Sequence, residues 1–300
     1  MEKTEWIWID GDLVPWDEAQ VHVLTHTMHY GGGAFEGIRA YKTERGPAIF
    51  RLEDHIDRLI YSAQAVAMKT TFDRDEICKA VVETVRKNGL SACYIRPIFF
   101  YGYGKMGINP IGAPVRLAIA CWPWGKYLPH DAVDIKVSSY IRIHPKSTKA
   151  DAKICGHYVN SMMAVLEVAG TKYHEALLLD YAGNIAEGPG ENIFLVYGNT
   201  VKTPRTASIL PGITRKTIIE ILRSQGFTVE ETDLSVEAAC AAEEAFFTGT
   251  AAEVTPIRSI DDNVFGDGTP GAVSSKVKEL YHGIVTGTNP DYEKYLTIVE

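Results

Sequence analysis

Apolar and polar residues alternate along several short segments of this 300-residue chain, and such alternation is typical of β-strands. Residues 6–9 and 13–14 lie on either side of Asp10-Gly11-Asp12, which predicts that the chain opens with a β-hairpin. A loop rich in glycine and proline is predicted at residues 102–114. Further strands are predicted at residues 35–41, 93–101, 115–121, 133–137, 175–180, 193–197 and 245–247.

Other segments carry apolar residues at helical spacing. Helices are predicted at residues 52–68, 75–87, 213–225 and 273–284, and Ser235 is predicted to cap a short alanine-rich helix. The helix predicted after Lys153 has an apolar face made of Val159, Met162, Met163, Leu166 and Ala169. Residues 26–36 match no ordinary element and are predicted to form a loop. Because strands and helices alternate only loosely, the predicted fold class is mixed α/β.

Two domains are expected from the length of the chain, since one core rarely organises 300 residues. The periodic pattern breaks at residues 122–129, where Trp122-Pro123-Trp124-Gly125 precede Lys126-Tyr127-Leu128-Pro129. We therefore predict a small N-terminal domain over residues 1–121, an interdomain loop over residues 122–133, and a larger domain over residues 134–300.

Composition narrows the class of protein. The net charge of −8 argues against a nucleic-acid-binding protein, which needs a basic face. No segment has the roughly 18 consecutive apolar residues of a membrane span, and the N-terminus lacks the apolar run of a signal peptide. The five cysteines are scattered without metal-ligand spacing, so no metal site is expected. A cytoplasmic protein is predicted.

Two glycine-containing turns are candidates for binding an anion. Pro211-Gly212-Ile213-Thr214 places free backbone N–H groups at the start of a predicted helix, where the helix dipole favours phosphate. Arg215 and Lys216 follow in the first turn, a position that is unfavourable for cations unless an anion lies nearby. The alternative is an ordinary helix start with exposed basic side chains. Gly249-Thr250-Ala251-Ala252, after a predicted buried strand, is a second and weaker candidate.

Lys153 and Glu187 are candidates for the chemistry of an imine-forming cofactor. A lysine amine can form an imine with an aldehyde, and a carboxylate can pair with a protonated ring nitrogen. Glycines after both residues, at Gly156, Gly188 and Gly190, indicate backbone that passes close to a ligand. The alternatives are a solvated lysine and an exposed carboxylate in a turn.

Several ordered motifs resemble those of one enzyme family. They are His29-Tyr30-Gly31 with Phe35-Glu36-Gly37-Ile38-Arg39, Tyr94-Ile95-Arg96-Pro97, Glu187-Gly188-Pro189-Gly190-Glu191-Asn192, Leu210-Pro211-Gly212-Ile213-Thr214-Arg215 and Gly249-Thr250-Ala251-Ala252-Glu253-Val254-Thr255-Pro256. Together they resemble the branched-chain amino acid aminotransferases, which are class IV, fold-type IV pyridoxal-phosphate enzymes. The resemblance covers residues 6 to 285 and implies a two-domain fold with a partly barrel-like sheet in the larger domain.

The resemblance implies a role for each matching residue. Lys153 is expected to hold pyridoxal 5′-phosphate through an imine, Glu187 to pair with the ring nitrogen, and Tyr158 to bond the ring's phenolic oxygen. The phosphate is expected on Arg58, Ile213, Thr214 and Thr250. The substrate α-carboxylate is expected on Tyr94, Ala251 and Ala252, and the side-chain pocket is expected to be lined by Tyr30, Phe35, Gly37, Arg96, Met106 and Trp124. Plain core packing is the alternative for Phe35 and Trp124.

The implied reaction is transfer of the amino group of L-leucine, L-isoleucine or L-valine to 2-oxoglutarate by a ping-pong mechanism. The expected partners are therefore amino acids and 2-oxo acids, with no nucleic acid and no membrane, and the chain is expected to form a homodimer or a larger homo-oligomer. D-amino acid aminotransferase, amine transaminase and aminodeoxychorismate lyase are alternatives within the fold. A phosphate- or nucleotide-binding module without catalysis is the alternative from another class.

The chain departs from the bacterial pattern of this family in two places. Gly32-Gly33-Ala34 stand where bulkier residues precede Phe35. The run from Lys153 to His157 stands where the family has a smaller, more glycine-rich run. Both departures are expected at the wall of the pocket or the edge of the cofactor.

Overall fold

The computed structural model describes residues 2–125, 127–128 and 130–300, which form two compact units. Unit 1 contains Met1–Gly125, Ala152–Gly156 and Gly283–Glu300, and unit 2 contains Lys126–Asp151 and His157–His282. Each unit has its own sheet and helices, so the predicted mixed α/β class is confirmed. The predicted domain limits stay a prediction, and Lys126 and Pro129 of the predicted interdomain loop lie outside the described residues.

Unit 1 is built on an eight-stranded antiparallel sheet, sheet A, with strand order β17-β5-β4-β6-β7-β1-β2 and with β3 paired to β6. Its strands are β1 (Trp6–Ile9), β2 (Asp12–Pro15), β3 (Gly33–Phe35), β4 (Ile38–Thr43), β5 (Gly46–Phe50), β6 (Cys93–Tyr101), β7 (Val115–Trp122) and β17 (Leu296–Ile298). The opening hairpin predicted from alternation is confirmed as β1 and β2. The C-terminal strand β17 pairs with β5, which explains why the last residues belong to unit 1.

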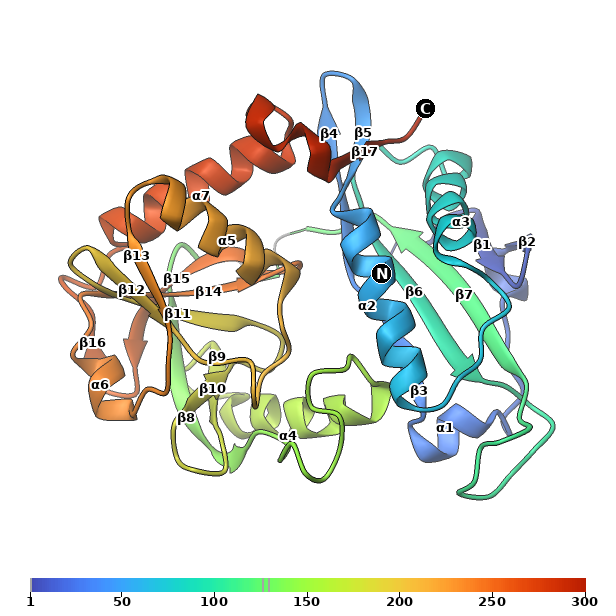
Figure 1. Ribbon diagram of the computed structural model, residues 1–300, viewed down its shortest axis with the longest axis horizontal. Coiled ribbons are helices and arrows are strands. Elements are labelled where there is room, and N and C mark those ends of the chain that lie inside the picture. Colours follow the sequence, from blue (N-terminus) through green and yellow to red (C-terminus); the bar gives the residue numbers. More distant parts are fainter. Residues whose placement is uncertain (1, 126, 129) are drawn as a thin grey trace. The chain divides into compact units, whose positions relative to one another are not determined.

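Two helices, α2 (Leu52–Ala65) and α3 (Arg74–Lys87), cover one face of sheet A (Figure 1). Both were predicted from helical spacing, and Asp73 starts α3 with a capping box to Glu76. Strand residues alternate between the two faces, so Ile95 and Phe99 of β6 pack into the core beneath these helices. The other face of the same strands carries the polar and aromatic residues of the candidate site.

The expectation of a loop over residues 26–36 is wrong, because a short helix α1 (His26–Tyr30) forms there. Gly31 ends it in the left-handed conformation, with a φ of 68°. A five-residue helix buries too little to leave a periodic pattern in the sequence, so tertiary contacts decide its formation.

Unit 2 contains a nine-stranded sheet, sheet B, with strand order β10-β9-β8-β15-β14-β11-β12-β13 and with β16 paired to β15. The pairs β8–β9, β8–β15 and β12–β13 are parallel and the others are antiparallel. The strands are β8 (Val133–Ile141), β9 (Glu175–Leu179), β10 (Ile185–Glu187), β11 (Asn192–Tyr197), β12 (Thr200–Thr203), β13 (Thr228–Glu231), β14 (Glu244–Gly249), β15 (Glu253–Ile260) and β16 (Asn263–Val264). Sheet B curls into a half-barrel, as expected.

Four α-helices accompany sheet B along the chain: α4 (Tyr158–Val168), α5 (Ile213–Ser224), α6 (Val236–Cys240) and α7 (Ala272–Val285). The 3₁₀ turns are η1 (Trp16–Glu18), η2 (Cys155–His157) and η3 (Pro290–Tyr295). Ser235 caps α6 by accepting a hydrogen bond from Ala238 N–H, as predicted. None of the helices in the described ranges is long and apolar enough to cross a membrane.

The apolar face predicted for α4 does not lie in the core. Val159, Met162, Met163 and Leu166 are exposed, whereas the buried residues of this helix are Ser161, Ala164 and Val168. These small buried residues allow α4 to pack closely on β8 and β9, so the helix needs no large apolar side chains on its inner face. The larger apolar side chains are left on the outer surface of unit 2.

A buried carboxyl group in β9 makes stability depend on pH. Glu175 is 3% exposed, accepts a hydrogen bond from Ala176 N–H, and burial raises its pKa from 4.5 to about 7. Because the folded state binds the proton of Glu175 more tightly than the unfolded state does, the stability that this proton contributes is complete below pH 4.5 and is lost as the pH rises through about 7.

Glu175→Gln is therefore expected to add on the order of 3 kcal/mol to the free energy of unfolding at pH 8 and little at pH 4. Urea unfolding of the parent protein and of Glu175→Gln between pH 4 and pH 8 tests this prediction. It would be contradicted if the free energies of unfolding of the two proteins changed in parallel with pH.

Candidate active site

Lys153 is fixed in unit 1 through its backbone. Its N–H donates to Ser62 Oγ at 2.9 Å, and its carbonyl accepts from Phe35 N–H at 3.1 Å. Ser62 is buried in α2 and donates its own hydroxyl to the carbonyl of Arg58. These contacts position the backbone independently of the lysine side chain, whose Nζ lies 5.0 Å from the ring centroid of Phe35.

The two segments that were expected to depart from the family pattern pack against each other. A Cβ on Gly33 would lie 2.8 Å from Cys155 Sγ, so the missing side chain of Gly33 leaves room for the Cys155 side chain. Likewise, Gly156 N–H donates to Gly31 O at 3.0 Å, and a Cβ on Gly31 would lie 2.9 Å from Gly156 Cα. The segment around Lys153 is therefore matched to the segment before Phe35, and neither can change size alone.

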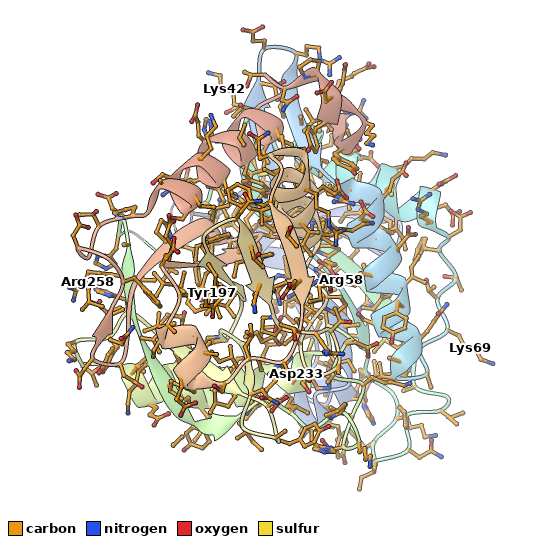
Figure 2. The ribbon with its side chains drawn as sticks, turned by 60° about the vertical axis from the view of Figure 1, so that its left-hand side comes forward. Lys42, Arg58, Lys69, Tyr197, Asp233 and Arg258 are labelled. Carbon is orange, nitrogen blue, oxygen red and sulfur yellow. The ribbon has the colours of Figure 1, made fainter. Side chains whose placement is uncertain are left out.

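Arg58, predicted to bind phosphate, lies in α2 and is labelled in Figure 2. Its guanidinium donates to both oxygens of Glu36, at 2.6 and 2.9 Å, and His55 Nδ1 lies 2.7 Å from the same carboxylate. Burial raises the pKa of Glu36, but Arg58 and His55 outweigh this effect and hold it well below its usual range. Burial lowers the pKa of His55, which favours neutral imidazole. Glu36 therefore fixes the orientation of Arg58.

The face of sheet A opposite α2 and α3 gathers several predicted pocket residues. Arg96 Cζ lies 4.7 Å from the ring centroid of Phe35 and 5.3 Å from that of Tyr94, and Arg96 Nη2 donates to Tyr94 Oη at 3.3 Å. The Tyr94 and Trp124 rings lie 5.1 Å apart. Within the described part of the chain, Arg96 has no carboxylate partner. If Phe35 and Trp124 served only in core packing, the guanidinium of Arg96 would be surrounded by aromatic rings without a counterion among the described residues.

Gly37 allows Tyr94 to approach the backbone. A Cβ on Gly37 would collide with the Tyr94 hydroxyl, so any larger residue displaces this phenol. The structure brings Gly37, Tyr94, Phe35, Arg96 and Trp124 into one cluster. Tyr30 and Met106 are exposed instead: Tyr30 ends α1 beside His26, and Met106 lies in the loop between β6 and β7.

Glu187 is buried in unit 2 at the end of β10, so the alternative of an exposed turn carboxylate is wrong. Arg142 Nε donates to Glu187 Oε1 at 2.5 Å, and Asn192 Nδ2 donates to Oε2 at 3.0 Å. Leu210 N–H donates to both oxygens at 3.2 Å. A cation and two neutral donors on one carboxyl favour its ionised form. Sequence reasoning missed Arg142, which lies in a polar loop with no local signal.

The turn before α5 is shaped by Asn192. A Cβ on Gly212 would collide with Asn192 Oδ1, and Asn192 Nδ2 also donates to Leu210 O at 3.0 Å. Gly212 starts α5 without a side-chain cap, and Ile213 and Thr214 after it are buried. The helix thus presents backbone N–H groups at its N-terminus, as the anion hypothesis requires.

Arg215 does not follow the alternative of an exposed basic side chain. It is buried and donates to Glu231 at 2.8 Å and to the carbonyl of Pro204 at 2.9 Å. Its position in the first turn of α5 therefore has a structural explanation and gives no support for an anion. The carboxylate of Glu231 offsets the unfavourable interaction between the Arg215 charge and the positive end of the helix dipole.

The second glycine turn connects β14 to β15 in unit 2. Gly249 pairs with Glu253, so Thr250, Ala251 and Ala252 form the turn, and Thr255 Oγ1 donates to Ala252 O at 2.8 Å. A Cβ on Gly249 would lie 3.2 Å from Gly190 O, which places this turn against the one that follows Glu187. Unit 2 thus brings Glu187, the start of α5 and this turn to one end of β11 and β14. Tyr158, the first residue of α4, belongs to the same unit.

The described residues contain no group of three or more His, Cys, Asp or Glu side chains placed to hold a metal ion. Each unit therefore carries its own set of candidate residues. The unit 1 set holds an amine and a guanidinium among aromatic rings. The unit 2 set holds a buried carboxylate, an uncapped helix start and a tight turn.

Comparison with known proteins identifies the family of the chain. The model of the family described as amino-transferase class IV matches residues 33–260. The chain is 44% identical to the branched-chain-amino-acid aminotransferase of Pseudomonas aeruginosa, over 98% of this chain and 97% of that one. It is 40% identical to the enzyme of the same name from Escherichia coli K12, over 97% and 96%. The structure of the branched-chain amino acid aminotransferase from Thermobaculum terrenum in its PLP form is 34% identical, with a TM-score of 0.94 and complete coverage of both chains. By its sequence and its fold, this chain belongs to the class IV aminotransferases.

Proposed function

We propose that this protein is a branched-chain-amino-acid aminotransferase that uses pyridoxal 5′-phosphate and transfers the amino group of L-leucine, L-isoleucine or L-valine to 2-oxoglutarate. The observation that carries the proposal is the position of Lys153 and Arg96, which both lie against the ring of Phe35. An amine and a guanidinium on one apolar ring suit a substrate that has both an apolar side chain and a carboxylate. The names of the relatives support the same assignment.

The residues present fit the cofactor. The carboxylate of Glu187 is held by Arg142, Asn192 and Leu210 N–H in a buried site, as a partner for a protonated ring nitrogen must be. The start of α5 has no side-chain cap, which leaves its backbone N–H groups suited to a phosphate, and we propose that Ile213, Thr214, Thr250 and Arg58 bind it. Tyr158 is proposed to bond the ring's phenolic oxygen.

Bound pyridoxal phosphate supplies an aldehyde that condenses with amines and a ring that accepts electrons from the substrate Cα. Lys153 Nζ would hold the cofactor covalently, and its amine would move the proton of the substrate Cα. Glu187 keeps the ring nitrogen protonated by remaining ionised. Tyr94 and the backbone of Ala251 and Ala252 bind the α-carboxylate of the substrate.

The aromatic cluster of unit 1 is proposed to form the side-chain pocket. Phe35, Trp124 and the backbone of Gly37 offer apolar contacts, and Arg96 with Tyr30 binds the second carboxylate when 2-oxoglutarate is the substrate. Met106 is proposed to complete the pocket. One methylene changes binding in an apolar pocket by about 1–3 kcal/mol, so use of all three branched amino acids is expected.

An amino-donor panel tests the proposed function. With 2-oxoglutarate as acceptor, L-leucine, L-isoleucine and L-valine are expected to yield L-glutamate at comparable rates. D-alanine and simple amines are expected to react far more slowly. A preference for D-alanine or an amine would assign the protein to another activity of the same fold. Absence of amino transfer from every donor, with nucleotide binding, would favour a non-catalytic module.

The exposed face of α4 supports a homo-oligomer. We propose that a second copy of the chain covers this face, because Val159, Met162, Met163, Val165 and Leu166 gather large apolar side chains on one short helix. Leu166 is 66% exposed, so a substitution there leaves the core intact. No nucleic-acid or membrane partner is proposed. A cytoplasmic location is proposed from the five cysteines, which are all free.

Leu166→Glu is expected to shift the protein toward smaller species, because a charge in an apolar interface is costly to desolvate. Light scattering after size exclusion measures the mass of each variant. Val264→Glu, a matched change at an exposed valine of β16, is the control and is expected to keep the parental mass. Equal masses for all three proteins would exclude α4 from the interface.

A further inference from the structure

Among the buried hydrogen-bond donors of sheet A that have no acceptor in the described residues, two lie in the aromatic cluster around Arg96. They are the indole Nε1 of Trp122 and the Nε of Arg96. Trp122 is only 8% exposed, so solvent does not satisfy its N–H group. A buried donor without an acceptor is unfavourable, and such groups are rare in folded proteins. A ligand that supplies a hydrogen-bond acceptor would satisfy both donors.

Trp122 and Arg96 lie on the same face of the sheet. Trp122 of β7 is directly opposite Tyr94 of β6, and Arg96 follows two residues after Tyr94. The Trp122 and Tyr94 rings lie 5.3 Å apart, and Arg96 Cζ lies 6.0 Å from the Trp122 ring centroid. The opposite face of the same strands is filled by the apolar core under α2 and α3. The two donors are thus neighbours within the cluster that contains Phe35 and Tyr94.

The chemistry of the two donors selects an anion with more than one oxygen. A guanidinium surrounded by Phe35, Tyr94 and Trp122 favours a negatively charged acceptor, and an indole can only donate. A carboxylate has two oxygens and can accept from both groups. A branched aliphatic side chain offers no acceptor to either of them.

We propose that Trp122 is a specificity-determining residue, whose indole N–H donates to the distal carboxylate of the dicarboxylate substrate beside Arg96. The inference rests on the proposed function, because it assigns a further contact to the 2-oxoglutarate half of the reaction. Trp122 thereby favours the dicarboxylate, and it contributes only apolar contact to the branched-chain substrates.

Trp122→Phe tests this assignment, because it removes the indole N–H and keeps an aromatic ring at the same position. In the holoenzyme, KM for 2-oxoglutarate is expected to rise about 10-fold, as for loss of a hydrogen bond to a charged group. KM for 4-methyl-2-oxopentanoate in the reverse reaction is expected to change less than about two-fold, and kcat is expected to be similar for both substrates. Trp8→Phe is the matched control, since Trp8 is buried on the opposite face and packs on Phe72.

Calorimetric titration with glutarate gives a readout that needs no turnover. Its dissociation constant is expected to rise about 10-fold in Trp122→Phe and to stay the same in Trp8→Phe. Unchanged glutarate binding, or an equal loss of affinity for glutarate and for 4-methylpentanoate, would overturn the proposal. Failure of the parent enzyme to transaminate would refute the proposed function instead, and the glutarate titration would still decide the role of Trp122.

Discussion

Replacing Lys153 with alanine is expected to reduce transamination of L-leucine by a factor on the order of 10⁴ or more, as for loss of other nucleophiles. Lys153 contacts Ser62 and Phe35 through its backbone, and alanine keeps both hydrogen bonds. The fold is therefore expected to persist, and the loss is confined to the amine that binds the cofactor and moves the Cα proton. Turnover and the visible absorbance of the purified protein measure the two effects together.

Lys149→Ala is the matched control for this experiment. Lys149 is exposed and lies four residues before Lys153, so its loss is expected to leave turnover and absorbance unchanged. A Lys153→Ala protein that keeps both properties would show that another amine performs the chemistry.

Glu187→Gln is expected to lower the rate by on the order of 10²- to 10³-fold, comparable to loss of a group that stabilises charge in a transition state. Glutamine keeps the volume of the side chain but cannot remain ionised to hold a proton on the ring nitrogen. The substitution also leaves the buried Arg142 without its carboxylate, which costs about 3–5 kcal/mol of stability. Rate and stability must therefore be measured separately.

Glu231→Gln separates these two effects. It removes the carboxylate from another buried arginine of unit 2, Arg215, and is expected to lower the unfolding midpoint without lowering kcat. If Glu187→Gln retained the parental kcat with bound cofactor, the proposed role of Glu187 would be refuted. Loss of rate in both variants would point to destabilisation as the common cause.

Local pattern was sufficient for the larger elements of unit 1. Helices α2 and α3 follow from helical spacing, and a capping box marks the start of α3. Strands β6 and β7 follow from long apolar segments. The short strands β10, β12, β13 and β17 depend on their neighbours for hydrogen bonds, so no local pattern identifies them. The helix α4 and its apolar face were predicted, but apolar spacing does not show what covers such a face, and the structure leaves it exposed.

In the candidate site, residues within motifs were predicted from the sequence, whereas residues that act through tertiary contacts were not. Motif resemblance identified Lys153 and Glu187, whose roles stay proposals. Arg142, 45 residues from Glu187 in sequence, and Ser62, 91 residues from Lys153, act through contacts that only the fold creates. In the sequence, Trp122 lies where the periodic pattern breaks, and nothing there marks it as a site residue. Only the structure shows that its indole N–H is buried without an acceptor among the described residues.

The covalent attachment site of the cofactor tests the central claim most directly. The holoenzyme is reduced with borohydride, digested, and its peptides are mapped by mass spectrometry. The account predicts one phosphopyridoxyl label, carried by the Nζ of Lys153. A label on a different lysine, or a protein that takes up no label after incubation with pyridoxal phosphate, would contradict it.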